Sequence, residues 1–411
     1  MSGEQSQVVY LDNNATTRVA PEVLDDMLPY LGERYGNPSS MHDFGGRVGR
    51  TLEEARERLA SVLGAEPTEI VFTSCGTESD NHAIRGTLES YPDKRHVVTT
   101  RVEHPAVRTL GQYLARRGYE VTELPVDSQG LLDLERYRES LRDDTAIVSV
   151  MWANNETGVM FPVEEMAHIA AERGIPFHTD AVQAVGKVPI NLRESAIDLL
   201  SLSGHKLHAP KGVGALYIRR GSRIRPLLIG GHQERERRGG TENVASIIGL
   251  GKAALLAQEC MPEEQTHVRA LRDRLERELL ARCPDARVNG DREQRLPNTL
   301  SISFEFVEGE AILLMLSQLG ICASSGSACT SGSLEPSHVL RAMGVPFSAA
   351  HGSIRFSLSR YTTDGEVDYT IEHVPQVIRR LRDISPFGRG ERPEAEAALT
   401  YGTGLRGAVA D

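Results

Sequence analysis

The sequence of 411 residues is poor in aromatic side chains, which make up 5% of it and include one Trp. Proteins that bind single-stranded nucleic acid stack its bases on aromatic side chains, so this class is not expected here. The formal net charge is −11, from 46 basic and 57 acidic side chains. An excess of acid also argues against a general nucleic-acid or anionic-membrane binder. With 40% hydrophobic and 25% charged residues, the composition is that of an ordinary globular protein.

Long apolar runs are absent as well. No segment approaches the ~18–20 consecutive apolar residues that a membrane span needs. The first residues, Met1-Ser2-Gly3-Glu4-Gln5, lack the basic start and the apolar core of a secretion signal. We therefore expect a cytoplasmic protein that does not bind a membrane.

Cysteine is sparse, and its five positions are Cys75, Cys260, Cys283, Cys322 and Cys329. An odd, widely spaced set does not indicate a disulfide framework, and no C-x-x-C pair indicates a zinc site. No metal site is therefore predicted in the isolated protein. Cys329 differs from the others because the nine residues Ser324 to Gly332 are all small. A thiol in such a polar loop is predicted to be functional, whereas structural cysteines normally lie among apolar residues.

Short apolar runs alternate with helical patterns over the first 260 residues. Strands are expected at 69–73, 96–100, 146–150, 175–179, 199–202 and 214–218, and this alternation predicts an α/β fold with a mostly parallel sheet. After about residue 260 an amphipathic helix precedes two segments that alternate at period two, 299–304 and 353–358. We interpret these as half-solvated strands of a smaller α+β domain. The expected division is 16–260 for the large domain, 1–15 with 261–384 for the small one, and 385–411 for a tail.

Two polar residues follow neighbouring strands of the expected sheet. Asp180 ends one strand, and Lys206 follows the next one after 26 residues, about one strand–helix–strand unit. Adjacent strand ends would present both side chains to one pocket. Pyridoxal phosphate needs this pairing, with a lysine to form a Schiff base and a carboxylate to keep the pyridinium nitrogen protonated. Taken alone, Lys206 also fits a surface lysine after a turn.

Other strand ends carry polar groups that suit the same kind of cofactor. Gly76 and Thr77 open a helix after a strand, where a phosphate could bind, although an ordinary Ser/Thr helix cap is the alternative. His104 could stack on a ring, and Asn155 could donate to an oxygen. The Gly-rich loop 237–243 around Thr241 suits a phosphate or is a solvated charged loop. Arg355 suits a substrate carboxylate or a structural ion pair.

At these residues the sequence resembles the cysteine desulfurases of the NifS/IscS group, which are class V aminotransferase-family enzymes of the fold-type I pyridoxal-phosphate fold. The matching segments run from residue 10 to about 360 and include 10–17, 35–40, His104 with Glu103, 178–183, 203–206, 238–243 and 324–338. The continuation 332–338 resembles nitrogen-fixation members. Cys75 departs from the pattern, because the family often has a small residue in this turn. No recognised motif covers the tail.

The resemblance implies a role for each matching residue. Lys206 would bond the cofactor and move the proton, Asp180 would pair with the pyridine nitrogen, and His104 would stack on the ring and serve as an acid–base group. Gln183 would bind the ring oxygen. Gly76, Thr77, Ser203 and His205 would hold the phosphate, with Thr241 reaching in from the second subunit of a homodimer. Asn155 and Arg355 would hold the substrate carboxylate, with Asn37 nearby.

The implied activity is the conversion of L-cysteine to L-alanine, with the sulfur held as a persulfide on Cys329 and passed to an acceptor protein for iron–sulfur cluster assembly, in particular for nitrogenase. Transient binding of an iron–sulfur cluster at Cys329 in a complex stays open. The alternatives are a selenocysteine lyase or another class V activity, which would not need Cys329, and a non-enzymatic metal or scaffold protein, which would need clustered ligands.

Overall fold

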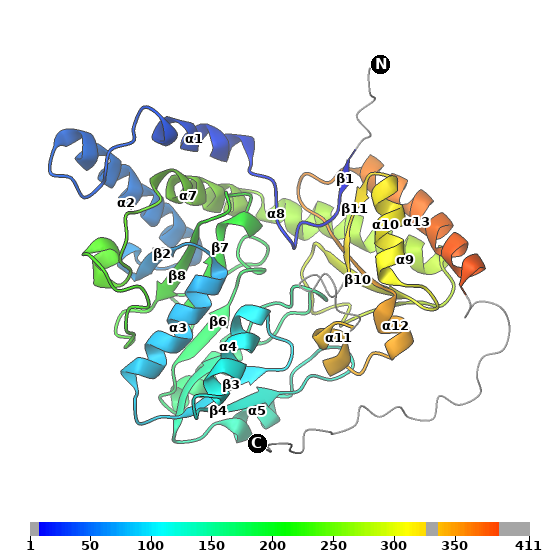
Figure 1. The fold of residues 1–411 in the computed structure, drawn as a ribbon, viewed down its shortest axis with the longest axis horizontal. Coiled ribbons are helices and arrows are strands. Elements are labelled where there is room, and N and C mark those ends of the chain that lie inside the picture. The colour runs from blue at the N-terminus through cyan, green and yellow to red at the C-terminus, as the bar shows by residue number, and fades with distance from the viewer. Residues whose placement is uncertain (1–7, 326–335, 386–411) are drawn as a thin grey trace, which may run out of the picture.

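The structure is a computed structural model that describes residues 8–325 and 336–385 (Figure 1). Cys329 and residues 386–411 of the expected tail lie outside the described residues.

A seven-stranded sheet occupies the first part of the chain. Its strands are β2 (Ile70–Thr73), β3 (His96–Thr100), β4 (Glu120–Leu124), β5 (Thr145–Ser149), β6 (Phe177–Asp180), β7 (Leu199–Ser203) and β8 (Gly214–Ile218), in the order β2-β8-β7-β6-β5-β3-β4. Only β8 runs antiparallel to its two neighbours, so the expected mostly parallel sheet is confirmed. Strand β4 was not expected. Leu124 is its one buried residue, because β4 lies at the sheet edge and its sequence carries no apolar run.

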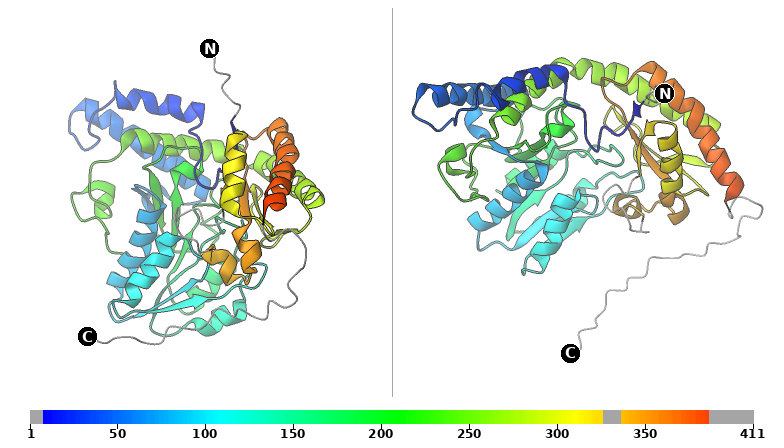
Figure 2. Two further views of the ribbon diagram at one scale, coloured as in Figure 1. Left: turned by 45° about the vertical axis from the view of Figure 1, so that its right-hand side comes forward. Right: turned by 45° about the horizontal axis from the view of Figure 1, so that its top comes forward.

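Helices cover both faces of this sheet (Figure 2). One face carries α1 (Pro21–Leu31), α2 (Asp43–Leu63), α6 (Val163–Glu172) and α7 (Val244–Glu259), and the other carries α3 (Gly76–Ser90) and α4 (Pro105–Ala115). The helix α5 (Leu134–Ser140) packs beside β4 and α6. Strand residues supply the two faces alternately, since successive side chains point to opposite sides. Phe72 joins the first core, for example, whereas Val71 joins the second.

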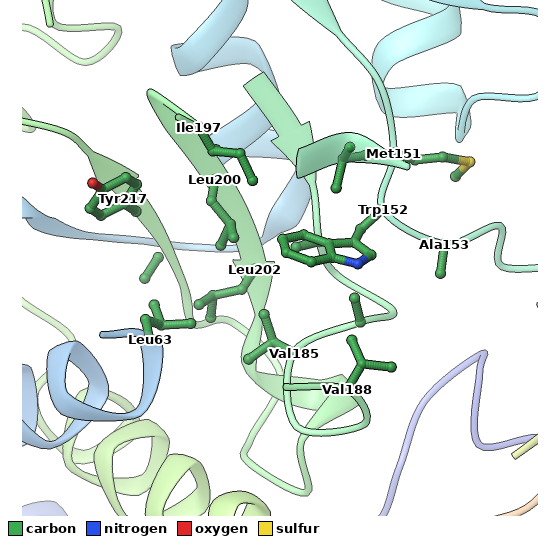
Figure 3. Packing of buried hydrophobic residues seen from close by; sticks show 14 of the residues in the cluster. Leu63, Met151, Trp152, Ala153, Val185, Val188, Ile197, Leu200, Leu202 and Tyr217 are labelled. Carbon is green, nitrogen blue, oxygen red and sulfur yellow. The ribbon is translucent and has the colours of Figure 1, made fainter. Parts of the chain in front are cut away.

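The loop after β5 is fixed by the single Trp of the chain. Trp152 is 7% exposed and packs in the first core with Leu202, Val185 and Val188 (Figure 3). Its amide donates to the carbonyl of Asp180, at 2.9 Å. Apolar packing thus holds the loops after β5 and β6 against each other at one edge of the sheet.

The remaining strands form two small sheets with a core of their own. β1 (Val9–Tyr10) pairs with β11 (Ile321–Cys322), and a four-stranded sheet has the order β12-β13-β10-β9, with β9 (Ala286–Val288), β10 (Thr299–Phe304), β12 (Ser324–Ser325) and β13 (Ser353–Ser357). The helices α9 (Arg269–Arg282), α10 (Gly309–Gln318) and α13 (Asp364–Ile384) pack on them, whereas the apolar residues of α11 (His338–Ala342) and α12 (Phe347–His351) join the first core. We propose that the two cores correspond to the large and small domains expected from the sequence, except that α11 and α12, within the expected small domain, pack in the first core.

The prediction that β10 and β13 are half-solvated is wrong, because every residue of both strands is buried. The polar side chains on their second face meet other polar groups instead of water. Asn289, for example, bonds the hydroxyls of Ser301 and Ser303. Buried polar groups that form hydrogen bonds give the same alternating pattern as groups that face solvent.

A bent helical segment joins α7 to α9. It consists of α8 (Met261–Glu263) and a π-helical turn at Glu264–Val268. Three short 3₁₀ turns complete the described elements, at Pro67–Glu69, Gly204–Lys206 and Gln233–Glu236. Among the helices of the described ranges none alone is long and apolar enough to cross a membrane, and the pair Val244–Glu259 and Met261–Arg282, bent by 51°, meets the length and composition only when taken together.

Candidate active site

The carboxyl ends of five strands meet at one edge of the large sheet. β3, β5, β6 and β7 run parallel, and β2 runs the same way because β8 is antiparallel to both β2 and β7. The residues that follow these ends are the ones that the sequence singled out. The sheet therefore brings them to a common edge, as expected of open α/β sheets.

Asp180 ends β6 in a nearly dry environment. It is 6% exposed, and one carboxylate oxygen accepts a hydrogen bond from the Val182 amide at 2.9 Å. Burial raises its pKa, while the charges of His104 and Lys206 and the amide hydrogen bond oppose that rise. Three predicted residues from three different strand ends are thus within electrostatic reach of one another.

Lys206 ends the 3₁₀ turn that directly follows β7. Its Nζ donates to the backbone carbonyls of Asn14 at 2.5 Å and Ala15 at 2.7 Å. Burial, together with the nearby charges of Arg355 and Lys187, lowers its pKa to about 7. An amine with a pKa near neutrality is partly unprotonated, which is the state that can attack a carbonyl or take a proton.

His104 lies at the start of α4, close enough to Asp180 and Lys206 for their charges to act on its ring. Its Nδ1 accepts a hydrogen bond from the Ala106 amide at 3.2 Å. Burial lowers its pKa, so the ring is neutral. Because Nδ1 accepts, we assign the ring proton to Nε2, which leaves that nitrogen free to serve a ligand.

The start of α3 is an uncapped helix end in close contact with the other strand ends. Its capping residue, Cys75, makes no side-chain capping bond, so the alternative of an ordinary Ser/Thr cap does not hold. A Cβ added at Gly76 would lie 2.7 Å from Val182 Cγ2 and 3.6 Å from Ser203 Cβ, so only glycine fits there. Thr77 is exposed beside it. A helix N-terminus without a cap offers free backbone amides to an anion.

Two further polar side chains at this edge lack partners within the described part of the chain. The Ser203 hydroxyl is buried and makes no hydrogen bond, and neither does Gln183 Oε1. Gln183 Nε2 donates to the Asn14 carbonyl at 3.0 Å. His205 Nδ1 lies 3.1 Å from the Thr16 hydroxyl, and burial lowers its pKa to about 4. Buried polar atoms without partners are costly in an otherwise satisfied core, so they indicate a ligand position.

Arg355 approaches the same edge from the four-stranded sheet. It is 2% exposed, and its guanidinium donates to the Asn155 carbonyl at 2.8 Å and to Asp12 Oδ1 at 2.9 Å. Its Nε is buried without a partner among the described residues. The structural ion pair that the sequence left open is therefore present, and the guanidinium keeps one donor group for a ligand.

Two predicted residues lie apart from this group. Asn37 lies in the exposed loop between α1 and α2, where its side chain accepts a hydrogen bond from the Ser39 amide. Figure 1 shows this loop far from β1 and α10. Thr241 is also exposed, and it lines a cavity of about 190 Å³ with Ser74 and Arg238. The geometry of the single chain thus assembles every described candidate except these two.

Comparison with known proteins gives a consistent result. The class V aminotransferase family model matches residues 9–370. A cysteine desulfurase NifS of Azotobacter vinelandii is 62% identical over 394 residues, which cover 96% of this chain and 98% of that protein. The chain belongs to this family, and within it to the cysteine desulfurases.

Solved structures similar to this chain share its fold. A NifS-like protein is 42% identical with a TM-score of 0.86, and the match covers 91% of this chain and 100% of that chain. A structure of SspA in complex with cysteine is 36% identical with a TM-score of 0.76, over 86% of this chain and 99% of that chain. The expected fold-type I architecture is therefore confirmed.

Some residues of this candidate site were missed by the sequence reasoning. Asn14 and Ala15 hold Lys206 through backbone carbonyls, and Asp12 holds Arg355. The available signal was the polar run 12–17 directly after a short apolar pair, which is unusual for the start of a helix or strand. Its function depends on backbone atoms, however, and these leave no trace in residue type.

A pair of buried carboxyl groups lies behind Asp180. Asp80 is 1% exposed, with one oxygen 3.6 Å from His178 Nε2. Glu103 is completely buried and accepts hydrogen bonds from the Thr100 hydroxyl at 2.8 Å and the Met151 amide at 3.1 Å. Burial, with the charge of Asp180 added to it, raises the pKa of both groups, and the pKa of Glu103 reaches about 8. Near neutral pH, Glu103 is therefore a neutral acid that fixes the loop carrying His104.

The buried Glu103 makes the stability of the protein depend on pH. Between the ordinary value of 4.5 and its folded pKa of about 8, the folded state keeps a proton that the unfolded state releases, so stability falls as pH rises. Glu103→Gln removes this loss and keeps the acceptor oxygen. We expect the stability of the variant relative to wild type to increase by about 4 kcal/mol between about pH 5 and pH 8, as measured by urea unfolding.

Glu89→Gln is the matched control, because Glu89 lies on α3 with an exposed side chain. Its stability should follow that of the wild type at every pH. Parallel curves for wild type and Glu103→Gln would contradict the assignment of a neutral Glu103.

Proposed function

We propose that this cysteine desulfurase uses pyridoxal phosphate to convert L-cysteine to L-alanine, with the sulfur transferred to Cys329. The observation that carries the proposal is the joint burial of Asp180 and Lys206 at adjacent strand ends. A buried carboxylate beside a near-neutral amine is the pair that this cofactor needs.

The residues present fit the cofactor on structural grounds. The uncapped start of α3, the close approach at Gly76 and the unpartnered Ser203 hydroxyl suit a phosphate, with Thr77 and His205 beside it. Pyridoxal phosphate, when bound, supplies a protonated ring that withdraws electrons from the substrate Cα. Asp180 would hold the proton on the ring nitrogen, and Gln183 would bind the ring oxygen. His104 would lie against the ring face.

Lys206 would move the proton. Its amine takes the proton from the substrate Cα and returns it, and a pKa of about 7 suits a group that must do both. The carbonyls of Asn14 and Ala15 orient Nζ whenever it is free. The neutral ring of His104 is available as a second acid–base group.

Arg355 and Asn155 would hold the carboxylate of L-cysteine. The partnerless Nε of Arg355 gives it a free donor, and the bond to Asp12 fixes the guanidinium plane. The relative solved with cysteine supports this choice of substrate. Asn37 and Thr241, which are exposed in the single chain, would complete the site of a second copy in a homodimer.

Cys329 lies outside the described residues, but the chain enters its segment beside the site. β12 ends at Ser325. The residue before it, Ser324, lies opposite Arg355 of β13 in the antiparallel strand pair. Cys329 comes four residues after Ser325, and four residues span at most about 14 Å. This reach supports Cys329 as the thiolate that attacks the substrate sulfur. The electron pair of the broken C–S bond returns to the alanine carbon skeleton, and the persulfide remains on the enzyme.

The thiol at position 329 is tested by replacing it. Cys329→Ala should abolish release of alanine and sulfide from L-cysteine, while the yellow colour of bound pyridoxal phosphate persists. Cys260→Ala, at the end of α7, serves as the control and should retain activity. Alanine release that is undiminished without Cys329 would favour the selenocysteine-lyase alternative. A colourless protein that cannot be reconstituted with pyridoxal phosphate would overturn the whole proposal.

The destination of the sulfur follows from the family membership. We infer that a cytoplasmic iron–sulfur scaffold protein accepts it, with nitrogenase as the final user, because the relative at 62% identity is a NifS protein. The acidic net charge supports a protein acceptor over nucleic acid or membrane.

Sulfur transfer can be followed directly. Enzyme loaded from labelled cysteine should pass the label to a purified iron–sulfur scaffold, and the Cys329→Ala enzyme should pass none. Label that leaves the enzyme only as free sulfide would contradict the inferred partner.

A further inference from the structure

Two of the five lysines in the chain line the same small cavity. Lys206 follows β7, and Lys187 follows β6. Both border a partly open space of about 20 Å³, together with Asn13, His208 and Glu264. Lys187 has no role in the activity described above. A second buried ammonium group beside a reactive lysine is a known way to activate that lysine.

Lys187 is connected to Lys206 through shared partners. It is 7% exposed, and its Nζ donates to the Gln183 carbonyl at 3.0 Å. The Gln183 side chain in turn donates to the Asn14 carbonyl, which also accepts from Lys206. The position of one amine is therefore fixed relative to the other by two intervening residues.

Glu264 supplies the opposite charge from the segment that joins α7 to α9. It is 6% exposed, and its Oε2 makes no hydrogen bond within the described residues. The next residue, Gln265, donates from its side chain to the Lys187 carbonyl. Both lie in the π-helical turn Glu264–Val268, a rare geometry that is frequent at functional sites. The cavity is large enough for one water, which the free carboxylate oxygen would bind.

The charged groups around both amines favour a neutral Lys206. Lys206 is faced by Arg355, Lys187, Asp12 and Asp180, with His104 and His205 beside it. Lys187 is faced by Glu264, Lys206 and His208. Arg360 also lines the cavity, and its charge acts on Glu264 and His208. The charge of Arg355 is already balanced by Asp12 at 2.9 Å. Burial lowers the pKa of Lys187 to about 8, against the charge of Glu264. Lys187 is therefore still charged at the pH where Lys206 titrates.

We propose that Lys187 is a positioning residue for Lys206: its buried charge, balanced by Glu264 across the cavity, keeps the neighbouring amine neutral. The role of Lys206 as proton carrier rests on the proposed function above. The π-helical turn couples this pair to the helix α9 of the small core, through Glu264 and Gln265.

Titration of the lysines in the full-length chain without cofactor tests the proposal. Isotope-labelled lysine gives only five side-chain NMR signals, and loss of one signal in Lys206→Ala assigns the reactive amine. Lys187→Met should raise the titration midpoint of Lys206 by roughly half to one pH unit. The pH midpoint for the rate of pyridoxal-phosphate capture should rise by the same amount, because only the neutral amine reacts.

Lys252→Met is the control, since Lys252 lies on α7 and is not among the groups that shift Lys206. An unchanged Lys206 midpoint in Lys187→Met overturns the proposal. If Lys187→Met does not fold, the titration of the wild-type protein tests the proposal. Lys187 must then have a higher titration midpoint than Lys206, and the reverse order overturns the proposal. If the titration midpoint of Lys206 does not change in Lys187→Met and the enzyme is an active desulfurase, only this inference is refuted. If the midpoint changes but the protein releases no alanine from L-cysteine, only the proposed function is refuted.

Discussion

The site depends on the hydrogen bonds that the Lys206 amine donates to the backbone carbonyls of Asn14 and Ala15. The Asn14 side chain also donates a hydrogen bond to Thr299 and accepts one from Asn298. Asn14 therefore connects the four-stranded sheet to the strand ends that carry Lys206. Asp12, two residues earlier, holds Arg355. A short N-terminal segment thus sets the position of the proposed proton carrier and of the proposed carboxylate binder together.

Burial rather than direct ion pairing controls the charges of this site. Removal from water raises the pKa of Asp180 and Glu103 and lowers that of Lys206 and His104, since a dry environment disfavours every charged form. Near neutral pH the site therefore holds a neutral imidazole and an amine that is only partly protonated. A cofactor with a protonated ring and a phosphate would add the charges that this arrangement lacks.

The sequence predicted the strand ends well, because apolar runs and the polar residues after them are local features. Parallel strands then bring Asp180, Lys206 and His104 to one edge without further information. The sequence did not predict contacts across long separations, such as Arg355 with Asp12, nor backbone partners such as Asn14. It also misjudged β10 and β13, because alternation cannot distinguish water from a buried polar neighbour such as Asn289. Asn37 and Thr241 lie apart from the other candidates in the single chain, and we propose that a second copy brings them to the site.

The central claim is that Lys206, rather than the more deeply buried Lys187, is the lysine that bonds pyridoxal phosphate. Reduction of the yellow enzyme with borohydride fixes the cofactor to the lysine that holds it, and peptide mass spectrometry then locates it. The account predicts the added mass on the peptide that contains Lys206 and on no other. Cofactor fixed at Lys187, or at one of the three remaining lysines, would contradict it.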